Sequence, residues 1–373
     1  MGQQTSLLFL SEQDIVDAGV YDTERCIEVC EEVFALLAAG DYVMGGPNGN
    51  SHGLTLVFPE ESPFEHMPLA GPDRRFVAMP AYLGGRFDLC GNKWYGSNAA
   101  NRERGLPRSV ITLVLNDRET GEPLAFMSAN LISAMRTGCI PGVACRHLAP
   151  AGAETLALVG CGAMARTCLP AVLATVPGIA HVACASRTRS HAEQFATWAA
   201  ETFDVHAEAC DTPREAIERG DVVCACASRV EPLVVESGWF KPDALVVLVG
   251  PMGADDAFWE RSRIVWDNTK LHEAYVDDAH ETDDYHAAYA RTIGGPVYEL
   301  MDAGRVEPLA RGCDLGHIVS GEKPGRTGAD GRIVCITSGM AVFDVAWGYA
   351  LYERARELGI GTPLTLWDAS AQV

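Results

Sequence analysis

The sequence predicts an α/β protein of two domains, one of which is a dinucleotide-binding domain of the Rossmann type. Its 373 residues are many for a single hydrophobic core. The first half reads as strands in hairpins, whereas from Thr155 onward strands and helices alternate, as in a parallel sheet. At that change, Glu154–Ala165 (ETLALVGCGAMA) has the spacing Gly-x-Gly-x-x-Ala.

The N-terminal half begins with a strand at Leu7–Leu10. Ser11 and Asp14 form a capping box for a brief helix, and Thr23 caps a longer helix that ends at Gly40. Strands are then predicted at Phe76–Pro80, Leu89–Tyr95, Val110–Leu115 and Leu124–Ser128, of which the last two form an antiparallel hairpin. A helix of small residues follows at Ala129–His147.

The second half is expected to form a parallel sheet. A helix from Gly339 to Leu358 is too long and apolar to stand alone, so we expect it to pack on the N-terminal domain or on a partner subunit. Polar or glycine-rich composition predicts loops at Asp277–Ala290 and Gly312–Arg332. The predicted strands are Thr155–Val159, His181–Ala185, Val205–Glu208, Val222–Cys226, Ala244–Val249, Arg263–Trp266 and Ile333–Ile336.

The glycine-rich segment matches the dinucleotide-binding fingerprint in spacing and in context. Gly160 makes a tight turn, Gly162 lets the backbone approach a pyrophosphate, and Ala165 lets the helix pack closely on the strand. The helix that starts there directs unpaired N–H groups and the positive end of its dipole at the phosphates. The alternative is an ordinary strand-turn-helix corner that binds nothing.

The segment after the second strand of this half bears on the choice of cofactor. An NAD site usually has Asp or Glu there to bond the ribose hydroxyls, but this chain has Arg187 and Arg189, and its next carboxylate is Glu193. Arginines attract a 2′-phosphate, so NADP(H) is favoured, with NAD(H) as the alternative, unless these are merely solvated loop residues. The predicted cofactor-binding residues are Gly160, Gly162, Ala163, Met164, Ser186, Arg187, Thr188, Ala227, Val249 and Gly250.

Composition argues against several classes of function. A net charge of −21 argues against partners that are nucleic acids or anionic membrane surfaces. No apolar run is long enough to span a bilayer, and no secretory leader is present. The thirteen cysteines include no CxxC pair, so we expect reduced thiols in a cytoplasmic protein and no structural metal.

Two cationic residues stand in apolar surroundings. Lys93 lies inside the strand-like run LCGNKWY, and Arg136 lies in a helix segment of small and apolar residues. Lys93 either points to solvent or is held in a pocket, where an ammonium can bind a carboxylate or assist proton transfer. Arg136 needs an anionic partner if it is buried, which could be a substrate carboxylate or an internal Asp or Glu.

Six segments are distinctive in combination. They are RFVAMPAYLGG (Arg75–Gly85), GNKWYGSN (Gly91–Asn98), RGLPRSVITLVLNDRETGEPLA (Arg104–Ala125), MRTG (Met135–Gly138), VGCGAMA (Val159–Ala165) and SGMAVFDVAWG (Ser338–Gly348). Together they resemble the ornithine cyclodeaminase/μ-crystallin family over nearly the whole chain. The N-terminal stretch is most similar to the branch that oxidises an amino-acid–glutamate adduct while making 2,3-diaminopropionate.

The resemblance implies a Rossmann domain, residues 152–333, inserted into an α/β domain, residues 1–151 with 334–373, that binds substrate and dimerises. It also implies that Lys93 and Arg136 face the nicotinamide and hold the α-carboxylate of an amino-acid substrate. The strand-rich N-terminal half and the apolar C-terminal helix predict more apolar surface than a small domain leaves exposed. We therefore expect a homodimer or a higher even oligomer.

The sequence departs from the family pattern at two places. Many members share the carboxylate with an arginine that is absent from Gly45–His52, and cyclodeaminases carry an aspartate just after the Val-Gly of the fifth strand. Here Val249 and Gly250 are followed by Pro-Met-Gly-Ala, and Asp255 and Asp256 come late. Ornithine cyclisation is therefore not expected.

Four further residues are weaker candidates. Asp314 and His317 occupy a loop where the family often has acidic residues, so either could be the acid/base, and Asp314 is predicted as catalytic. His52 and Asn98 are predicted substrate ligands. For all four, the alternative is a capping or surface role.

These features favour an NAD(P)-dependent oxidoreductase that acts on the C–N bond of an amino acid or an N-substituted amino acid. The reaction would be hydride transfer between an amine and an imine, in either direction. The alternatives are an amino-acid cyclodeaminase that recycles its bound nicotinamide and a non-catalytic NADP(H)-binding protein of the crystallin type.

Overall fold

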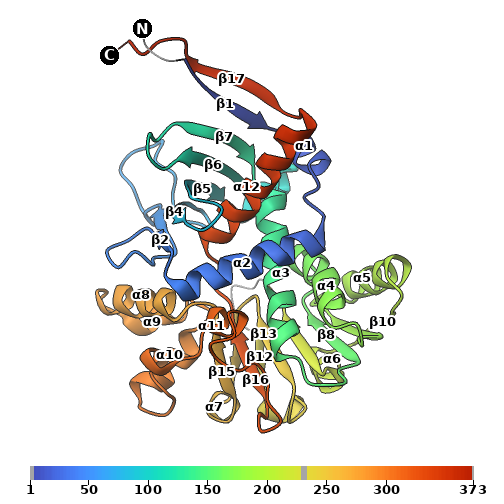
Figure 1. Ribbon diagram of the computed structural model, residues 1–373. Coiled ribbons are helices and arrows are strands. Elements are labelled where there is room, and N and C mark those ends of the chain that lie inside the picture. The colour runs from blue at the N-terminus through green and yellow to red at the C-terminus, as the bar shows by residue number, and fades with distance from the viewer. Residues whose placement is uncertain (1–3, 228–232, 372–373) are drawn as a thin grey trace. The chain divides into compact units, whose positions relative to one another are not determined.

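The computed structural model describes residues 4–227 and 233–371 (Figure 1). Two compact units can be distinguished. Unit 1 comprises Met1–Asp22, Ala39–Arg136 and Met340–Val373, and unit 2 comprises Thr23–Ala38 and Thr137–Gly339. Unit 1 therefore draws its residues from both ends of the chain. Among the described residues, no helix combines the length and the hydropathy that crossing a bilayer requires.

Unit 1 is built on an eight-stranded sheet with the order β17-β1-β7-β6-β5-β4-β2, in which β3 also pairs with β4. β1 and β7 are parallel and the other pairs are antiparallel. The predicted hairpin is confirmed as β6 and β7. The strands are β1 (Thr5–Leu10), β2 (Tyr42–Met44), β3 (Leu54–Val57), β4 (Arg75–Leu83), β5 (Leu89–Ser97), β6 (Ser109–Asp117), β7 (Pro123–Ser128) and β17 (Thr362–Trp367).

Helix α12 (Ala341–Leu358) packs on one face of this sheet, over β4, β5 and β6 (Figure 1, red). Gly91 in β5 makes the close approach possible, because a Cβ there would lie 2.7 Å from Cγ2 of Val345. Val342, Val345 and Ala346 are buried by this packing. Of the two expectations for this apolar helix, packing on its own chain is therefore correct, and its apolar face is not available to a partner. The short helices α1 (Glu12–Asp17) and η1 (Ala99–Arg104) complete unit 1.

Unit 2 is built on a seven-stranded, wholly parallel sheet with the order β10-β9-β8-β11-β13-β16-β15. The predicted α/β class with a Rossmann-type sheet is confirmed. Its strands are β8 (Thr155–Val159), β9 (His181–Ala185), β10 (His206–Ala209), β11 (Val222–Ala225), β13 (Leu245–Leu248), β15 (Arg263–Trp266) and β16 (Ile333–Ile336), and β12 (Leu233–Val235) pairs separately with β14 (Met252–Ala254).

Helices fill most of the connections of unit 2. α2 (Thr23–Ala39) lies largely within this unit, and α3 (Asn130–Leu148) enters it at Thr137. The others are α4 (Ala163–Thr175), α5 (Arg189–Thr202), α6 (Pro213–Arg219), α7 (Asp256–Glu260), α8 (Thr269–His280), α9 (Tyr285–Tyr289), α10 (Gly295–Asp302) and α11 (Leu315–Val319), with short η2 (Ser237–Trp239) and η3 (Leu309–Arg311) turns.

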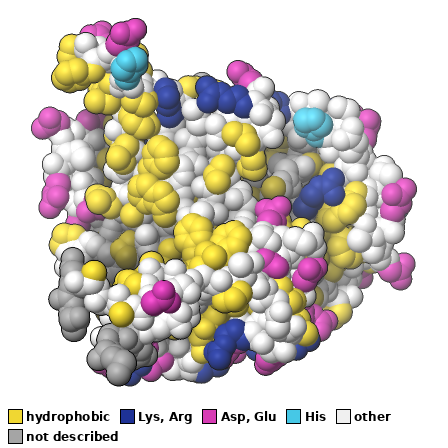
Figure 2. All heavy atoms as spheres, turned by 90° about the horizontal axis from the view of Figure 1, so that it is seen from above, with side chains coloured by type: hydrophobic (Ala, Val, Ile, Leu, Met, Phe, Trp, Pro, Cys, Tyr) yellow, Lys and Arg dark blue, Asp and Glu magenta, His cyan; other side chains and the backbone are white. Residues whose placement is uncertain are grey.

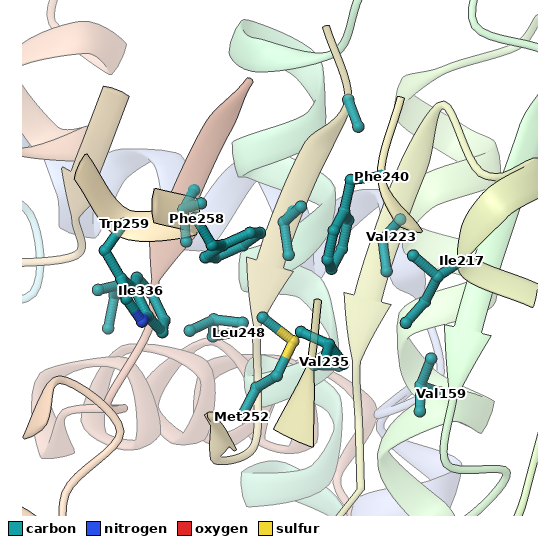
Figure 3. Close-up of a cluster of buried hydrophobic side chains, with 14 of the residues drawn as sticks. Val159, Ile217, Val223, Val235, Phe240, Leu248, Met252, Phe258, Trp259 and Ile336 are labelled. Atoms are coloured by element: carbon teal, nitrogen blue, oxygen red, sulfur yellow. The ribbon is translucent and has the colours of Figure 1, made fainter. Parts of the chain in front are cut away.

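The core of unit 2 packs side chains of the sheet against those of α7 and neighbouring loops (Figure 3). Within this core, the ring of Phe258 contacts two other rings. Its centroid lies 4.9 Å from that of Phe240 and 4.9 Å from that of Trp259. Leu248 and Ile336 from two neighbouring strands lie beside these rings. This packing fixes the strands whose carboxyl ends carry the glycine-rich turn.

The structure confirms several local predictions and overturns one. The capping box is present, with Ser11 N donating to Oδ2 of Asp14 (2.8 Å) and Asp14 N to Oγ of Ser11 (3.2 Å). The predicted loop at Asp277–Ala290 is wrong, because α8 and α9 occupy most of it. Their N-cap residues, Asn268 and Asp284, are polar starts that composition alone does not distinguish from loop residues.

Candidate active site and dinucleotide loop

Three segments meet at the carboxyl edge of the unit 2 sheet, beyond β8, β11 and β13. Gly160 follows β8 with a φ of +102°, which favours glycine. A Cβ at Gly160 would lie 2.6 Å from the backbone nitrogen of Ala227, which follows β11. Gly250 follows β13 and donates its N–H to the carbonyl of Ala225 (2.8 Å). β8 and β11 are neighbours where the strand order reverses, which is where open α/β sheets bind ligands.

Helix α4 begins directly after this turn. Its N-cap, Gly162, has extended backbone, and, its chain neighbours apart, no atom of residues 4–227 or 233–371 lies within 4 Å of the position that its Cβ would take. Ala163 and Met164 are the first residues of the helix. The first amides of a helix have no partner inside it and, with the helix dipole, they attract phosphate. The open space beside Gly162 thus fits the pyrophosphate of a dinucleotide, as the sequence predicts.

The segment after β9 carries the predicted adenosine-side residues. Ser186 and Arg187 follow the strand, and Thr188 is the N-cap of α5. Arg189 pairs with Glu193 (Nε–Oε1 3.0 Å) and with Asp211. Both arginines are exposed, but Arg189 already pairs with two carboxylates, so Arg187 is the stronger candidate for a 2′-phosphate.

In unit 1, Lys93, Arg136 and Asp344 form a buried charged cluster. Lys93 lies in the middle of β5 on the face that α12 covers, Arg136 lies in the part of α3 that belongs to unit 1, and Asp344 lies in the first turn of α12. Oδ2 of Asp344 accepts a hydrogen bond from Nζ of Lys93 (2.8 Å) and is 3.0 Å from Nη2 of Arg136. Lys93 and Arg136 are each 4% exposed, and Asp344 is 0% exposed.

Burial and charge together set the protonation of this cluster. Burial lowers the pKa of Lys93 to about 8; Asp344 acts against this shift, and Arg136 adds to it. Burial opposes ionisation of Asp344, but Arg136 and Lys93 outweigh it, so the pKa of Asp344 lies below its usual value. Within this cluster two cations contact a single carboxylate, and a buried cation is costly unless an anion balances it.

Asp344 is the residue that sequence reasoning missed. It stands in AVFDVAWGYAL, a run as apolar as those around Lys93 and Arg136, so the same signal was present. It also answers the question that the sequence left open for Arg136, because the internal carboxylate exists. This one carboxylate is shared by both cations.

Asp314 accepts two hydrogen bonds from one residue at the start of α8. Its Oδ1 accepts from the N–H of Thr269 (2.7 Å), and its Oδ2 accepts from the hydroxyl of the same residue (3.0 Å). Burial raises the pKa of Asp314, and the bonds from Thr269 oppose this shift. Nδ1 of His317 is 3.7 Å from Asp314. Both oxygens are thus engaged by Thr269, one by its backbone and one by its side chain, and the predicted catalytic role of Asp314 stays a prediction.

The two predicted substrate ligands lie elsewhere in unit 1. Asn98 caps η1, with its Oδ1 accepting from the N–H of Ala100 (3.0 Å), and lines a hollow of about 540 Å³ together with Trp94. Since alternate residues of a strand face opposite sides, this hollow lies on the other face of the sheet from Lys93. His52 is half-buried between β2 and β3. The structure therefore does not place Asn98 beside Lys93.

The late aspartates of the fifth-strand loop have structural partners. Asp255 caps α7 and accepts from Ser237 N (2.6 Å) and Phe258 N (2.9 Å). Asp256 pairs with Arg305 at 2.6 Å. Met252, which occupies the stretch where a cyclodeaminase has its aspartate, is buried in the core of unit 2 (Figure 3). Neither carboxylate is therefore free to take the place of the missing one.

The unit 2 sheet is of the Rossmann type and has an open, glycine-lined turn at its switch point, which places the chain among the dinucleotide-binding proteins. Unit 1 contains the buried cluster of Lys93, Arg136 and Asp344. The chain belongs to the ornithine cyclodeaminase/mu-crystallin family, whose model matches residues 20–359. The resemblance stated from the sequence motifs is thus confirmed.

Relatives within and around this family share nearly the whole chain. N-((2S)-2-amino-2-carboxyethyl)-L-glutamate dehydrogenase of Staphylococcus aureus is 28% identical over 97% of this chain and 99% of its own. The Δ1-pyrroline-2-carboxylate reductase of Thermococcus litoralis, solved with NADH and L-proline, has a TM-score of 0.75 at 24% identity and covers 95% of this chain and 99% of its own. An archaeal alanine dehydrogenase dimer with bound NAD has a TM-score of 0.77 at 22% identity, over 97% and 100%.

Proposed function

We propose that this protein is an NAD(P)-dependent oxidoreductase that interconverts an amine and an imine at the α-carbon of an amino acid or N-substituted amino acid. The observation that carries the proposal is the buried cluster of Lys93, Arg136 and Asp344, in which two cations share one carboxylate oxygen. A carboxylate is the common feature of the amino acids and imino acids on which the named relatives act. That carboxylate would neutralise the cluster.

Each cation of the cluster has a distinct task. Arg136 offers a planar guanidinium that can anchor the substrate α-carboxylate through paired hydrogen bonds. Lys93, with a pKa of about 8, can exist in both protonation states near neutral pH, so it can bind the carboxylate and take part in proton transfer. The nicotinamide, when bound, supplies the hydride chemistry, and the protein contributes binding and orientation.

Net oxidation or reduction is favoured over redox-neutral cyclodeamination. The aspartate that would activate water or a ring-closing amine is replaced by the Pro251-Met252 stretch, and Asp255 and Asp256 are engaged in structural contacts. Arg187 supports a preference for NADP(H), since the segment directly after β9, Ser186–Arg189, holds no carboxylate to repel a 2′-phosphate. NAD(H), which is bound in the solved relatives, is the alternative.

Absorbance at 340 nm tests the proposed activity. The protein is mixed with each cofactor and a panel of amino acids, N-carboxyalkyl amino acids and cyclic imino acids, and ammonia is measured in parallel. Net formation or consumption of reduced cofactor is expected. Ammonia release without a net change in absorbance would instead indicate a cyclodeaminase, and no reaction with any substrate would favour a non-catalytic NADP(H)-binding protein.

Lys93→Ala and Arg136→Ala test the assignment of the site. Each should lower turnover by about 10²–10⁴-fold while dinucleotide binding is kept, because removing a proton-transfer group typically has this effect. Matched controls are Lys241→Ala, which removes an ion pair with Asp221, and Arg146→Ala, which removes one with Glu31. Wild-type kcat/KM in either site variant would contradict its role.

We propose that a second copy of the chain binds the outer face of the unit 1 sheet, which is the face opposite to the one that α12 covers. Phe76, Trp94, Val110 and Phe126, on four adjacent strands, are 37–50% exposed there, and the rings of Phe76 and Trp94 stack at 5.6 Å. Hydrophobic side chains gather in groups on the face of the molecule that Figure 2 shows. Exposed apolar area of this kind usually marks an interface, and two-fold pairing is the commonest way to cover it. The solved archaeal alanine dehydrogenase is a dimer.

We also propose a functional division of the chain: residues 1–151 with 334–373 bind substrate and dimerise, and residues 152–333 bind the dinucleotide. The dinucleotide turn at Gly160 and Gly162 lies within the second range, and Lys93, Arg136 and Asp344 lie within the first. In the whole protein, Lys93→Ala and Arg136→Ala should leave the Kd for NADPH unchanged, which would support this division, and a loss of NADPH binding in both variants would contradict it.

A further inference from the structure

Asp344 is the best-enclosed charged group of unit 1. Its side chain is 0% exposed and comes from the first turn of α12, whereas its partners come from β5 and α3. One oxygen, Oδ2, contacts both Nζ of Lys93 and Nη2 of Arg136. The carboxylate thus joins three elements that are distant in sequence, with 251 positions between Lys93 and Asp344.

The surroundings of Lys93 are otherwise apolar. Met79 of β4 and Leu113 of β6 flank it in register, and both are buried. The polar and charged groups that face it are Asp344 from α12, Arg136 from α3 and, at 5.9 Å from Nζ, the ring of Tyr95 in its own strand. Ser133 of α3 contributes a hydroxyl 3.4 Å from Nη2 of Arg136. Asp344 is therefore the carboxylate that balances Lys93.

We propose that Asp344 is the positioning residue of the substrate site: its buried Oδ2 holds the Lys93 ammonium and the Arg136 guanidinium side by side, so that both cations meet the substrate carboxylate together. The inference rests on the proposed function, because it assigns to Asp344 the arrangement of groups that bind substrate. Asp344 itself touches neither substrate nor cofactor in this scheme.

The electrostatic consequence has a definite sign. The charge of Asp344 holds the Lys93 proton more tightly, whereas burial and Arg136 weaken its hold. Removing that charge must lower the pKa of Lys93 below about 8. Above the new pKa, the fraction of Lys93 that is protonated falls about tenfold for each unit of the shift. A carboxylate 2.8 Å from Nζ of Lys93 raises that pKa whatever its role, so a purely structural Asp344 would differ by leaving the pH dependence of substrate binding unchanged.

Titration of Lys93 by NMR tests the proposal without relying on catalysis. The chain has only four lysines, Lys93, Lys241, Lys270 and Lys323, so side-chain 13C labelling of lysine gives few signals, and Lys93→Met identifies the one of interest. In the whole protein, Asp344→Asn should move the titration midpoint of Lys93 to lower pH by one unit or more. Asp344→Glu, which keeps the charge, should leave the midpoint near that of wild type.

Kinetics provide the second readout. If the Lys93 ammonium binds the substrate carboxylate, kcat/KM declines as pH rises through its pKa. Asp344→Asn should shift this decline to lower pH, with a loss of about eightfold or more at pH 8.5, mainly through KM. Asp221→Asn, which removes the Lys241 ion pair in unit 2, is the matched control and should leave the profile unchanged.

The outcomes separate this inference from the proposed function. An unshifted Lys93 midpoint in a folded Asp344→Asn protein overturns the positioning role even if wild type is an active oxidoreductase. If the midpoint shifts but no amine–imine activity exists, the proposed function fails. Should Asp344→Asn not fold, Asp344→Ser, which leaves room for water, replaces it; if neither folds, Asp344 serves the fold alone and the inference is refuted.

Discussion

Replacing Gly162 with alanine should weaken dinucleotide binding while the protein stays folded. Gly162 is the N-cap of α4 with φ −94° and ψ −162°, an extended backbone that alanine adopts without strain. In the part of the chain that the structure describes, no atom other than those of the chain neighbours lies within 4 Å of the new Cβ. Because glycine is preferred over alanine at an N-cap, the free energy of unfolding without cofactor should fall by less than about 1 kcal/mol.

The loss of affinity can be estimated from the bonds at stake. The added methyl group would occupy the space through which the backbone approaches the pyrophosphate. Losing one charge-assisted hydrogen bond there costs about 1.5–3 kcal/mol, which corresponds to roughly 10- to 150-fold in Kd. Isothermal titration with NADPH and NADH measures this change, and thermal unfolding of the cofactor-free protein measures stability.

Two other glycines serve as controls. Gly160→Ala should lose both stability and binding, because its Cβ would lie 2.6 Å from Ala227 N and its φ is +102°. Gly152→Ala has comparable backbone strain, with φ +74°, but nothing within 4 Å of the new Cβ, so it should lose only about 1–2 kcal/mol and bind cofactor normally. The reasoning is refuted if Gly162→Ala binds both dinucleotides like wild type, or if Gly160→Ala is as stable as Gly152→Ala.

Three further predictions concern specificity, assembly and packing. Arg187→Asp should shift preference from NADP(H) toward NAD(H), because a carboxylate repels the 2′-phosphate and bonds the ribose hydroxyls. Titration with both cofactors measures this preference, and a wild-type protein that already prefers NAD(H) would refute the prediction. Trp94→Asp places a charge on the outer face of the unit 1 sheet and should therefore prevent dimerisation. Light scattering should give twice the 40.0 kDa chain mass for wild type and the mass of one chain for the variant. A wild-type monomer would rule out the proposed dimer. Gly91→Ala should lower the melting temperature by several degrees, because its Cβ would lie 2.7 Å from Val345 and overpacking costs about 1–3 kcal/mol; an unchanged melting temperature would show that α12 can move away from the sheet at little cost.

Local patterns predict the dinucleotide turn well and the charged cluster only in part. β8 is a continuous apolar run that ends at a glycine, so its bounds and the turn after it can be read directly from the sequence. Lys93 and Arg136 are recognisable because a charge in an apolar segment needs a partner. That partner is 251 positions from Lys93, and local periodicity carries no information about a contact at such a separation.

The same reasoning explains the elements that were missed. β17 is exposed along its whole length and pairs at the edge with β1, so it lacks the alternation that marks a half-buried strand. α8 and α9 are short or polar helices whose N-caps, Asn268 and Asp284, resemble loop residues when composition is judged. Prediction thus fails where tertiary contacts, rather than local apolar patterns, stabilise the element.

The pairing of β1 with β17, in which Leu7 lies opposite Leu364, has a consequence for synthesis of the chain. β1 is synthesised long before β17, so this edge pair can form only after β17 has been made. Asp344 and α12 also emerge late, so Lys93 and Arg136 exist for most of translation without their carboxylate. Strands β8 to β16, in contrast, are all made before α12. Contacts of such long range slow folding. The substrate site should therefore be the last part to form. A chain truncated before α12 should still complete the parallel sheet but should have no catalytic activity.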